Sequence, residues 1–366
     1  MEENKIYPIV AIIPSLNPDD NLLHTVDAIL NTGFSDIILV DDGSKKECQN
    51  YFDILAKKQG VSVVHHKENK GKGAALKTAF QYYLTNYNQS MYKGVVTADA
   101  DGQHLAQDIY NTAEKMLKEA NSFDRVLVLG TRDFDDPIVP FKSKNGNKIT
   151  TVVFQVLYGK RINDTQTGLR AISNTYVSEC LELKGNRFEY EILMLMDAVL
   201  SKVMISEVKI ETVYLNQNRE THFNPIKDSF KIYKVMLGNF VKFSCTGFLS
   251  MALDQGLFAI FVNLLFGFLK VENGIVISTV LARVCSSFFN YMVNRTVVFK
   301  SKSGISSFVR YYALCVVQML ASAGGVVLAY NLTKGNPSVL KLIVDLLLFF
   351  ISYQIQQRWV FAGEER

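Results

Sequence analysis

The sequence has few cysteines and lacks the common phosphate-binding motifs, and these absences exclude several classes of protein. Its five cysteines show no metal-ligand spacing and three lie in apolar segments, so we expect buried, reduced thiols. No GxxxxGK(S/T) segment is present, which excludes a P-loop ATPase on motif grounds. Leu76 stands where a dinucleotide fingerprint that began at Gly71 and Gly73 would need a third glycine. No cluster of Lys and Arg with interleaved aromatic residues indicates nucleic acid as a partner.

Apolar residues are distributed unevenly along the 366 residues. The chain up to about residue 240 has the mixed composition of a soluble protein, whereas the remainder is dominated by long apolar runs. This length leaves room for two domains. The polar N-terminus leads straight into an expected strand, so we expect no signal peptide and a first domain in the cytosol.

The acidic stretch TADADGQH, residues 97–104, follows an apolar run that is typical of a buried parallel strand. Asp99 and Asp101 would point to opposite faces of a continuing strand, and Gly102 supplies the turn that lets them converge. Two carboxylates and the side-chain oxygen of Gln103 form an incomplete shell of hard ligands that suits Mg²⁺ or Mn²⁺. A solvated acidic turn that caps the next helix is the alternative.

Strand-like runs alternate with helical segments before this stretch and after it, which predicts an α/β fold with a parallel, doubly wound sheet. We expect five strands, within 8–14, 36–42, 61–66, 94–97 and 125–132.

Polar side chains follow the first, second and fourth expected strands, where open α/β sheets place their ligands. Asn17 follows the first strand, and Asp41 and Asp42 end the second, where a carboxylate can accept hydrogen bonds from a base and a ribose. Gly71 precedes a helix and would let backbone N–H groups approach a phosphate or a sugar, with Lys72 beside it. An ordinary strand-to-helix turn is the alternative for this Gly-bearing segment.

Six motifs in order resemble the family 2 glycosyltransferases of the GT-A fold, and among them the polyprenyl-phosphate sugar transferases, such as dolichol-phosphate mannose synthase and bactoprenol glucosyltransferase. The motifs are IPSLNPDDNL, LVDDGS, NKGKGAAL, TADADGQH, GTR and NDTQTGLRAIS. The resemblance spans residues 8 to about 230. It implies that the nucleotide is held by Pro14, Asn17 and Asp42, and the metal by Asp99, Asp101 and Gln103. Pro18 replaces a glutamate common in the family, so Asp19 or Asp20 would take over that contact, and the base, UDP or GDP, stays open.

The same resemblance assigns the remaining candidate site residues. Contacts to an acceptor phosphate fall on Arg132, on Ser143 and on the adjacent Lys142. The sugar site would be lined by Asp164, Gln166 and Arg170. Glu189 or Glu191 would face the donor sugar, and of the two we chose Glu189. The catalytic candidates are Asp101, Arg132 and Arg219; Arg219 is chosen from its position before an expected membrane-surface helix, where a lipid-borne phosphate would meet the nucleotide diphosphate.

Residues 1–225 thus form the expected GT-A domain, 226–240 an amphipathic interface helix, and 241–366 an all-α transmembrane domain. In the interface helix, apolar residues alternate with Lys227, Lys231 and Lys234, as in helices that lie on a membrane surface. Four apolar stretches follow, near 243–269, 274–293, 309–332 and 338–357, each long enough to cross a bilayer. Positive charge concentrates on one side of these stretches. We therefore expect a multi-pass protein of the cytoplasmic membrane, with both termini and the catalytic domain in the cytosol.

The two membrane hairpins look like copies in a parallel repeat. Phe240-Val241-Lys242-Phe243 matches Phe308-Val309-Arg310-Tyr311, and we expect Arg295 and Arg358 at equivalent depths. The stretch resembles the GtrA-like membrane proteins that accompany bactoprenol-linked sugar transfer. Asp254 and Arg283 lie inside apolar helices and are expected to pair, either for lipid handling or to hold helices together.

The sequence therefore predicts a metal-dependent, inverting transferase that moves one sugar from a nucleotide-sugar to a polyprenyl phosphate, undecaprenyl or dolichyl, for glycan or cell-envelope glycosylation. An ionised phosphate acceptor needs cations but no general base, and the five histidines show no pairing that marks a base. The alternatives are transfer to a hydroxyl of a glycolipid or polysaccharide, and a non-catalytic carrier or flippase for lipid-linked sugar. An oligomer is possible.

Overall fold

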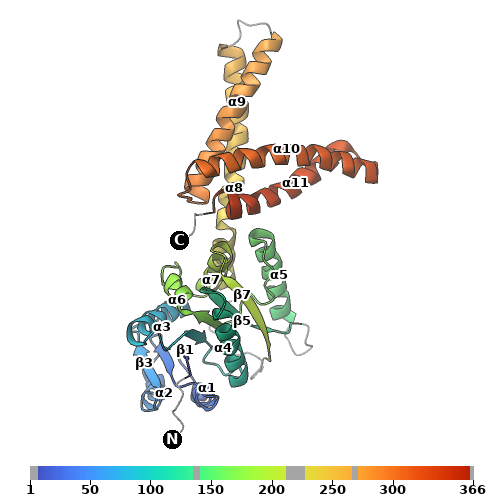
Figure 1. Cartoon of the computed structure of the whole chain (residues 1–366). Coiled ribbons are helices and arrows are strands. Elements are labelled where there is room, and N and C mark those ends of the chain that lie inside the picture. The colour runs from blue at the N-terminus through green and yellow to red at the C-terminus, as the bar shows by residue number, and fades with distance from the viewer. Residues whose placement is uncertain (1–6, 135–140, 212–226, 266–270, 363–366) are drawn as a thin grey trace. The chain divides into compact units, whose positions relative to one another are not determined.

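The computed structural model describes residues 7–134, 141–211, 227–265 and 271–362, and divides the chain into two compact units, Met1–Met236 and Leu237–Arg366. The first unit contains a seven-stranded sheet with the order β3-β2-β1-β4-β6-β5-β7 (Figure 1). Its strands are β1 (Ile9–Ser15), β2 (Ile37–Asp41), β3 (Val61–His65), β4 (Gly94–Thr97), β5 (Val126–Arg132), β6 (Arg170–Ser173) and β7 (Met204–Ile210). The predicted α/β fold with a mostly parallel sheet is confirmed, and all five expected strands are present.

Two strands were not predicted. The short β6 lies antiparallel between β4 and β5, and β7 extends the sheet beyond β5. We had assigned Arg170 to a sugar-binding segment, and its place at the start of β6 depends on pairing with Thr97 and Leu129, both far away in the chain. Such long-range pairing leaves no periodic signal in a run of four residues.

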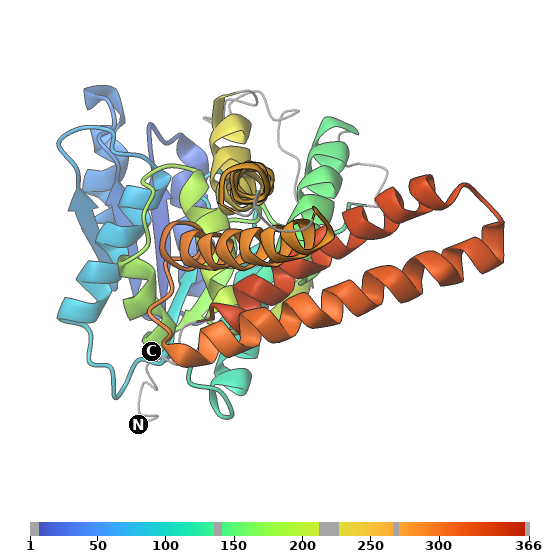
Figure 2. The same cartoon turned by 90° about the horizontal axis from the view of Figure 1, so that it is seen from above.

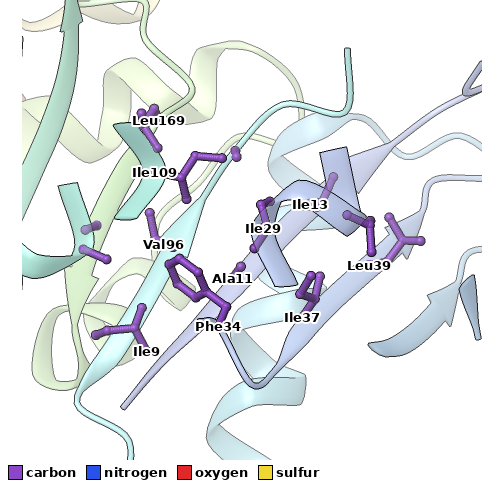
Figure 3. Close-up of a cluster of buried hydrophobic side chains, with 14 of the residues drawn as sticks. Ile9, Ala11, Ile13, Ile29, Phe34, Ile37, Leu39, Val96, Ile109 and Leu169 are labelled. Atoms are coloured by element: carbon purple, nitrogen blue, oxygen red, sulfur yellow. The ribbon is translucent and has the colours of Figure 1, made fainter. Parts of the chain in front are cut away.

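Helices cover both faces of the sheet. Side chains of α1, α2 and α4 pack against one face, where Ile9, Ile13 and Val96 meet Ile29 and Ile109 in a dry core (Figure 3). The helices α3, α6 and α7 lie over the other face (Figure 1). The helices of this unit are α1 (Asp20–Asn31), α2 (Gln49–Leu55), α3 (Lys72–Asn86), α4 (Ala106–Ala120), α5 (Phe141–Tyr158), α6 (Asn174–Leu181) and α7 (Glu189–Leu200), with a short 3₁₀ turn η1 (Lys46–Cys48).

The second unit is built from long apolar helices, and in the described part of the chain four helices are long and apolar enough to cross a membrane. The helix α8 (Lys227–Ile260) is continuous, so the expected interface segment and the first apolar span form one helix. It is followed by η3 (Phe261–Leu265), α9 (Val271–Val293), η4 (Asn294–Val298), α10 (Ile305–Thr333), α11 (Pro337–Ile355) and η5 (Gln356–Val360), where η3, η4 and η5 are π-helical. The helices α10 and α11 run side by side (Figure 2).

The two π-helices at the ends of α9 and α11 correct the expected register of the repeat. Each closes with the same hydrogen bond, from Phe299 N–H to Asn294 O at 2.9 Å and from Phe361 N–H to Gln356 O at 2.8 Å. Asn294 therefore matches Gln356, and these two side chains hydrogen-bond directly, with Nδ2 of Asn294 3.1 Å from Oε1 of Gln356. In this register Arg295 matches Gln357 and not Arg358, so the expected equivalence of Arg295 and Arg358 is one residue out of register.

A charged pair inside the first hairpin is confirmed. Arg283 Nη2 lies 3.2 Å from Asp254 Oδ2, and the Ser286 hydroxyl donates to Asp254 Oδ1 at 2.9 Å. Both partners satisfy a carboxylate that would be costly to leave unpaired in an apolar environment.

The close approach of β4 and β6 generates a stability prediction. A Cβ at Gly94 would lie 2.2 Å from the Ile172 carbonyl oxygen, so Gly94→Ala should destabilise the protein by about 2 kcal/mol. Thermal unfolding of the full chain in detergent measures this loss. Gly146→Ala is the matched control: a Cβ there meets nothing within 4 Å, and in the interior of α5 it should add up to about 1 kcal/mol. Equal unfolding temperatures for both variants would contradict the pairing of β4 with β6.

Candidate active site

The carboxylate of Asp41, at the end of β2, is occupied by protein donors. It accepts hydrogen bonds from Ser44 N–H at 2.8 Å, from the Gln49 amide at 3.0 Å and from His65 Nδ1 at 3.0 Å. Although burial acts in the opposite direction, these bonds lower the pKa of Asp41. Asp41 was a candidate for substrate contact, and its bonds here shape the turn after β2.

Asp42 connects the same strand end to the segment before α3. It accepts from Gly71 N–H at 2.7 Å, from Lys70 N–H at 3.0 Å and from His66 Nδ1 at 2.7 Å. The His66 ring is 6% exposed, and its Nε2 lies 2.9 Å from the Thr78 hydroxyl on α3. The Gly71 N–H that we expected to approach a phosphate or sugar is thus used by Asp42.

The loop after β1 meets the loop after β2. Asn17 has a positive φ of 48°, donates its N–H to the Ser44 hydroxyl at 2.8 Å and accepts from Lys45 N–H at 2.9 Å. Pro14 lies in β1 beside Val40. Both residues thus lie close to the end of β2 and to Asp41 and Asp42.

The two aspartates proposed as replacements for the family's glutamate have other partners. Asp19 caps α1 by accepting from Asn21 N–H at 3.0 Å, and Asp20 accepts from the Tyr51 hydroxyl at 3.1 Å.

Asp99 and Asp101 lie just beyond the end of β4, where the turn at Gly102 has a positive φ of 74°. Asp99 N–H is 3.3 Å from His104 Nδ1, and Asp101 Oδ1 accepts from Gln103 N–H at 3.1 Å. The crowding of protein atoms around Asp101 and the neighbouring charge of Asp99 raise the pKa of Asp101 to about 6. The two carboxylates are therefore close enough to repel each other.

Lys72 joins this acidic pair to α7. Its Nζ lies 2.6 Å from Asp99 Oδ1 and 2.9 Å from Glu191 Oε1. Despite burial, the charge of Lys72 lowers the pKa of Asp99 to about 2. Glu191 is thus the glutamate that reaches the site, whereas Glu189, our choice, accepts from Asn186 N–H and Arg187 N–H before α7.

Arg132, at the end of β5, is held by a two-pronged ion pair. Its Nε and Nη2 donate to the two oxygens of Asp164 at 2.7 and 3.0 Å. The Asp164 side chain is fully buried, whereas that of Arg132 keeps 23% of its surface exposed. Gln166 is exposed and its N–H donates to Asp164 at 3.1 Å. Asp164 therefore orients Arg132, which is near enough to Asp99 to help lower the pKa of that carboxyl group.

Arg170, expected in the sugar site, is only 1% exposed. Its Nε donates to the Thr167 carbonyl at 3.0 Å and its Nη1 to the Glu191 carbonyl at 2.7 Å. Arg170 therefore holds the first turn of α7, which carries the Glu191 partner of Lys72.

Some candidates fall outside what the structure describes. Arg219 lies outside the described residues, and so do the side chains of Lys142 and Ser143, whose backbone is in the first turn of α5.

The residues around Asp99 fit a divalent cation. Three carboxylates, those of Asp99, Asp101 and Glu191, face one ammonium group, that of Lys72, while Arg132 is balanced by Asp164. The excess of two negative charges matches one divalent ion. Within the described residues, no group of three or more His, Cys, Asp or Glu side chains could hold a metal, so further ligands would have to be amide, water or substrate oxygens.

Two family models match the chain. The model of glycosyl transferase family 2 matches residues 10–177, and that of the GtrA/DPMS transmembrane domain matches residues 242–361. The first match contains the acidic pair and Arg132, and the second contains most of the apolar helices.

Individual relatives share less than a third of their aligned residues with this chain. The UDP-N-acetylglucosamine--dolichyl-phosphate N-acetylglucosaminyltransferase of Methanococcus voltae is 29% identical over 63% of this chain and 94% of its own length. The uncharacterized protein MJ1222 of Methanocaldococcus jannaschii is 28% identical over 63% of this chain and 91% of its own. A solved structure of a mycobacterial protein is 15% identical, with a TM-score of 0.47, and the match covers 64% of this chain and 76% of that one.

The two family matches account for the acidic residues after β4, for the basic side chains around them and for the long apolar helices. The chain combines a glycosyl transferase family 2 domain with a GtrA/DPMS transmembrane domain and is a multi-pass membrane glycosyltransferase.

Proposed function

We propose that the enzyme transfers a single sugar from a nucleotide-sugar to the phosphate of a polyprenyl phosphate, with inversion and with Mg²⁺ or Mn²⁺ as cofactor. The observation that carries the proposal is the placement of a partly exposed arginine, Arg132, near a site whose three carboxylates exceed its one ammonium group by two negative charges. The similarity to the Methanococcus voltae enzyme, named for transfer to dolichyl phosphate, supports the same acceptor class.

In this proposal, the acidic pair binds the nucleotide-sugar donor through the metal ion. Asp99, Asp101 and the side chain of Gln103 would hold the ion, which neutralises the diphosphate as it leaves. The donor would be a UDP- or GDP-sugar, and the name of the Methanococcus voltae relative favours UDP. Pro14, Asn17, Asp41 and Asp42 form the adjacent strand-end region in which we place the nucleotide.

The acceptor side needs positive charge more than it needs a base. A phosphate monoester is ionised at pH 7 and attacks without losing a proton, whereas a hydroxyl acceptor requires a general base. His65 and His66 are bonded to Asp41 and Asp42, and His104 to the Asp99 N–H. Arg132, oriented by Asp164, is suited to hold the phosphate, and single displacement inverts the sugar carbon. Arg219, Lys142 and Ser143 remain candidates for the same phosphate.

We place the reaction at the cytoplasmic face of the cell membrane. Lys300 and Lys302 lie between the second and third apolar helices, with Arg295 near the end of the second and Arg310 near the start of the third, on the same side as the N-terminal end of α8. The positive-inside rule assigns this side to the cytosol.

Transfer to extracted lipids with radiolabelled nucleotide-sugars tests the acceptor. A labelled lipid that survives alkali and is cleaved by mild acid supports a polyprenyl phosphate sugar. Label in a glycolipid or polymer would instead indicate a hydroxyl acceptor, and binding without turnover would indicate a carrier.

Loss of one acidic ligand should abolish turnover. Asp101→Asn removes a charge from the proposed metal site and should lower the transfer rate at least about 100-fold. Chelation with EDTA should have the same effect on wild type, and Mn²⁺ should reverse it. Asp27→Asn, which alters only the ion pair with Lys58, is the control and should keep its activity. An Asp101→Asn enzyme with near wild-type turnover would refute the metal assignment.

Replacing the two-pronged arginine should affect the lipid selectively. Arg132→Lys keeps the charge but cannot pair with both oxygens of Asp164, so the KM for polyprenyl phosphate should rise about tenfold. The KM for the nucleotide-sugar should stay within about twofold. A rise confined to the nucleotide-sugar would place Arg132 on the donor instead.

A further inference from the structure

Lys72 is the only described cation in direct ion-pair contact with the acidic pair. It is the first residue of α3, and the preceding Gly71 is fixed because its N–H donates to Asp42. Its Nζ bridges Asp99 and Glu191, and its side chain keeps only 17% of its surface exposed. The ammonium group therefore has two carboxylate partners, one on each side.

The backbone at Gly168 lies against another side of the Asp99 carboxylate and limits access to it. A Cβ at Gly168 would lie 2.4 Å from Asp99 Oδ2 and 2.8 Å from Oδ1, so only glycine lets the carboxylate lie there. The Gly168 carbonyl is itself fixed by the Thr97 hydroxyl at 2.7 Å. With Gly168 on that side and Lys72 on Oδ1, a cation that binds Asp99 through Oδ1 must share or displace the ammonium group.

Glu191 is well placed to keep the ammonium group when that happens. Its side chain is only 9% exposed, and its backbone carbonyl is held by the buried guanidinium of Arg170. Transfer of Lys72 from two carboxylates to one leaves the ammonium group paired inside the site. A lysine with one partner alone would have to move into solvent.

We propose that Lys72 acts as an internal counter-ion that neutralises Asp99 in the metal-free enzyme, yields Asp99 to the divalent ion, and stays on Glu191. This inference rests on the proposed metal site. Lys72 then weakens binding of the free ion, so the ion binds well only together with the negative phosphates of the donor. It also keeps a positive charge beside the departing diphosphate.

The test is binding of Mn²⁺ alone to the full chain in detergent, with free Mn²⁺ measured by electron paramagnetic resonance. Lys72→Gln should bind Mn²⁺ about tenfold tighter than wild type, because a positive charge next to the ion is gone. Its transfer rate should nevertheless fall. A residue that merely supported the fold of Asp99 would weaken both properties together.

Matched variants separate charge from structure. Lys72→Arg keeps the charge and should bind Mn²⁺ like wild type. Lys77→Gln, on the same helix, loses a lysine that bonds Asn186 and should change neither property. Glu191→Gln should weaken Mn²⁺ binding, because the ammonium group then has Asp99 as its one remaining carboxylate.

The outcomes distinguish this inference from the proposed function. If wild type binds Mn²⁺ and Asp101→Asn does not, the metal site stands; unchanged or weaker binding by Lys72→Gln would then overturn the role of Lys72 alone. If wild type binds no Mn²⁺ with or without nucleotide-sugar, the proposed metal site itself fails. Thermal unfolding of each variant shows whether a loss of binding reflects a loss of fold.

Discussion

The geometry of the active site depends on the hydrogen bonds that Asp42 accepts from the backbone before α3. Through Lys70 N–H and Gly71 N–H, one carboxylate at the end of β2 fixes where α3 begins. Lys72 is the first residue of that helix, so the same bonds determine where its ammonium group meets Asp99 and Glu191. His66 and Thr78 hold Asp42 from the other side. The strand ends at which we propose nucleotide and metal binding are therefore connected through charged and polar side chains and not only through the sheet.

Many polar groups that the sequence analysis assigns to substrate are occupied by protein partners. Asp41, Asp42 and Asp164 each accept hydrogen bonds from two or more donors, and Arg170 is bonded to two carbonyl groups. Buried charges are tolerated only when paired in this way. Arg132 and Asp101 retain solvent-exposed surface, which makes them the groups best able to meet a ligand.

Much of the catalytic unit could be predicted from the sequence because its signals are local. The apolar runs before Asp41, Asp99 and Arg132 are strands, and the polar residues after them lie at strand ends. Glu191 could not be separated from Glu189, because the choice depends on how α7 packs against α3. The hydrogen bonds of His66 could not be predicted, because its partners, Asp42 and Thr78, are separated from it by 24 and 12 positions. In the membrane unit, the four apolar helices were evident, but the repeat register was not, because it depends on the backbone hydrogen bonds that close η4 and η5.

The antiparallel β6 has a consequence for how the protein is made. This strand separates β4 from β5, although it follows both in the chain. On a ribosome, β4 can pair with β1 as it emerges, but β5 can join the same sheet only after residues 170–173 have left the exit tunnel. The ion pairs of Lys72 are completed later still, because Glu191 on α7 is translated after Asp99. The catalytic pocket is thus completed only shortly before the first apolar helix reaches the membrane insertion machinery, so insertion and maturation of the enzyme nearly coincide.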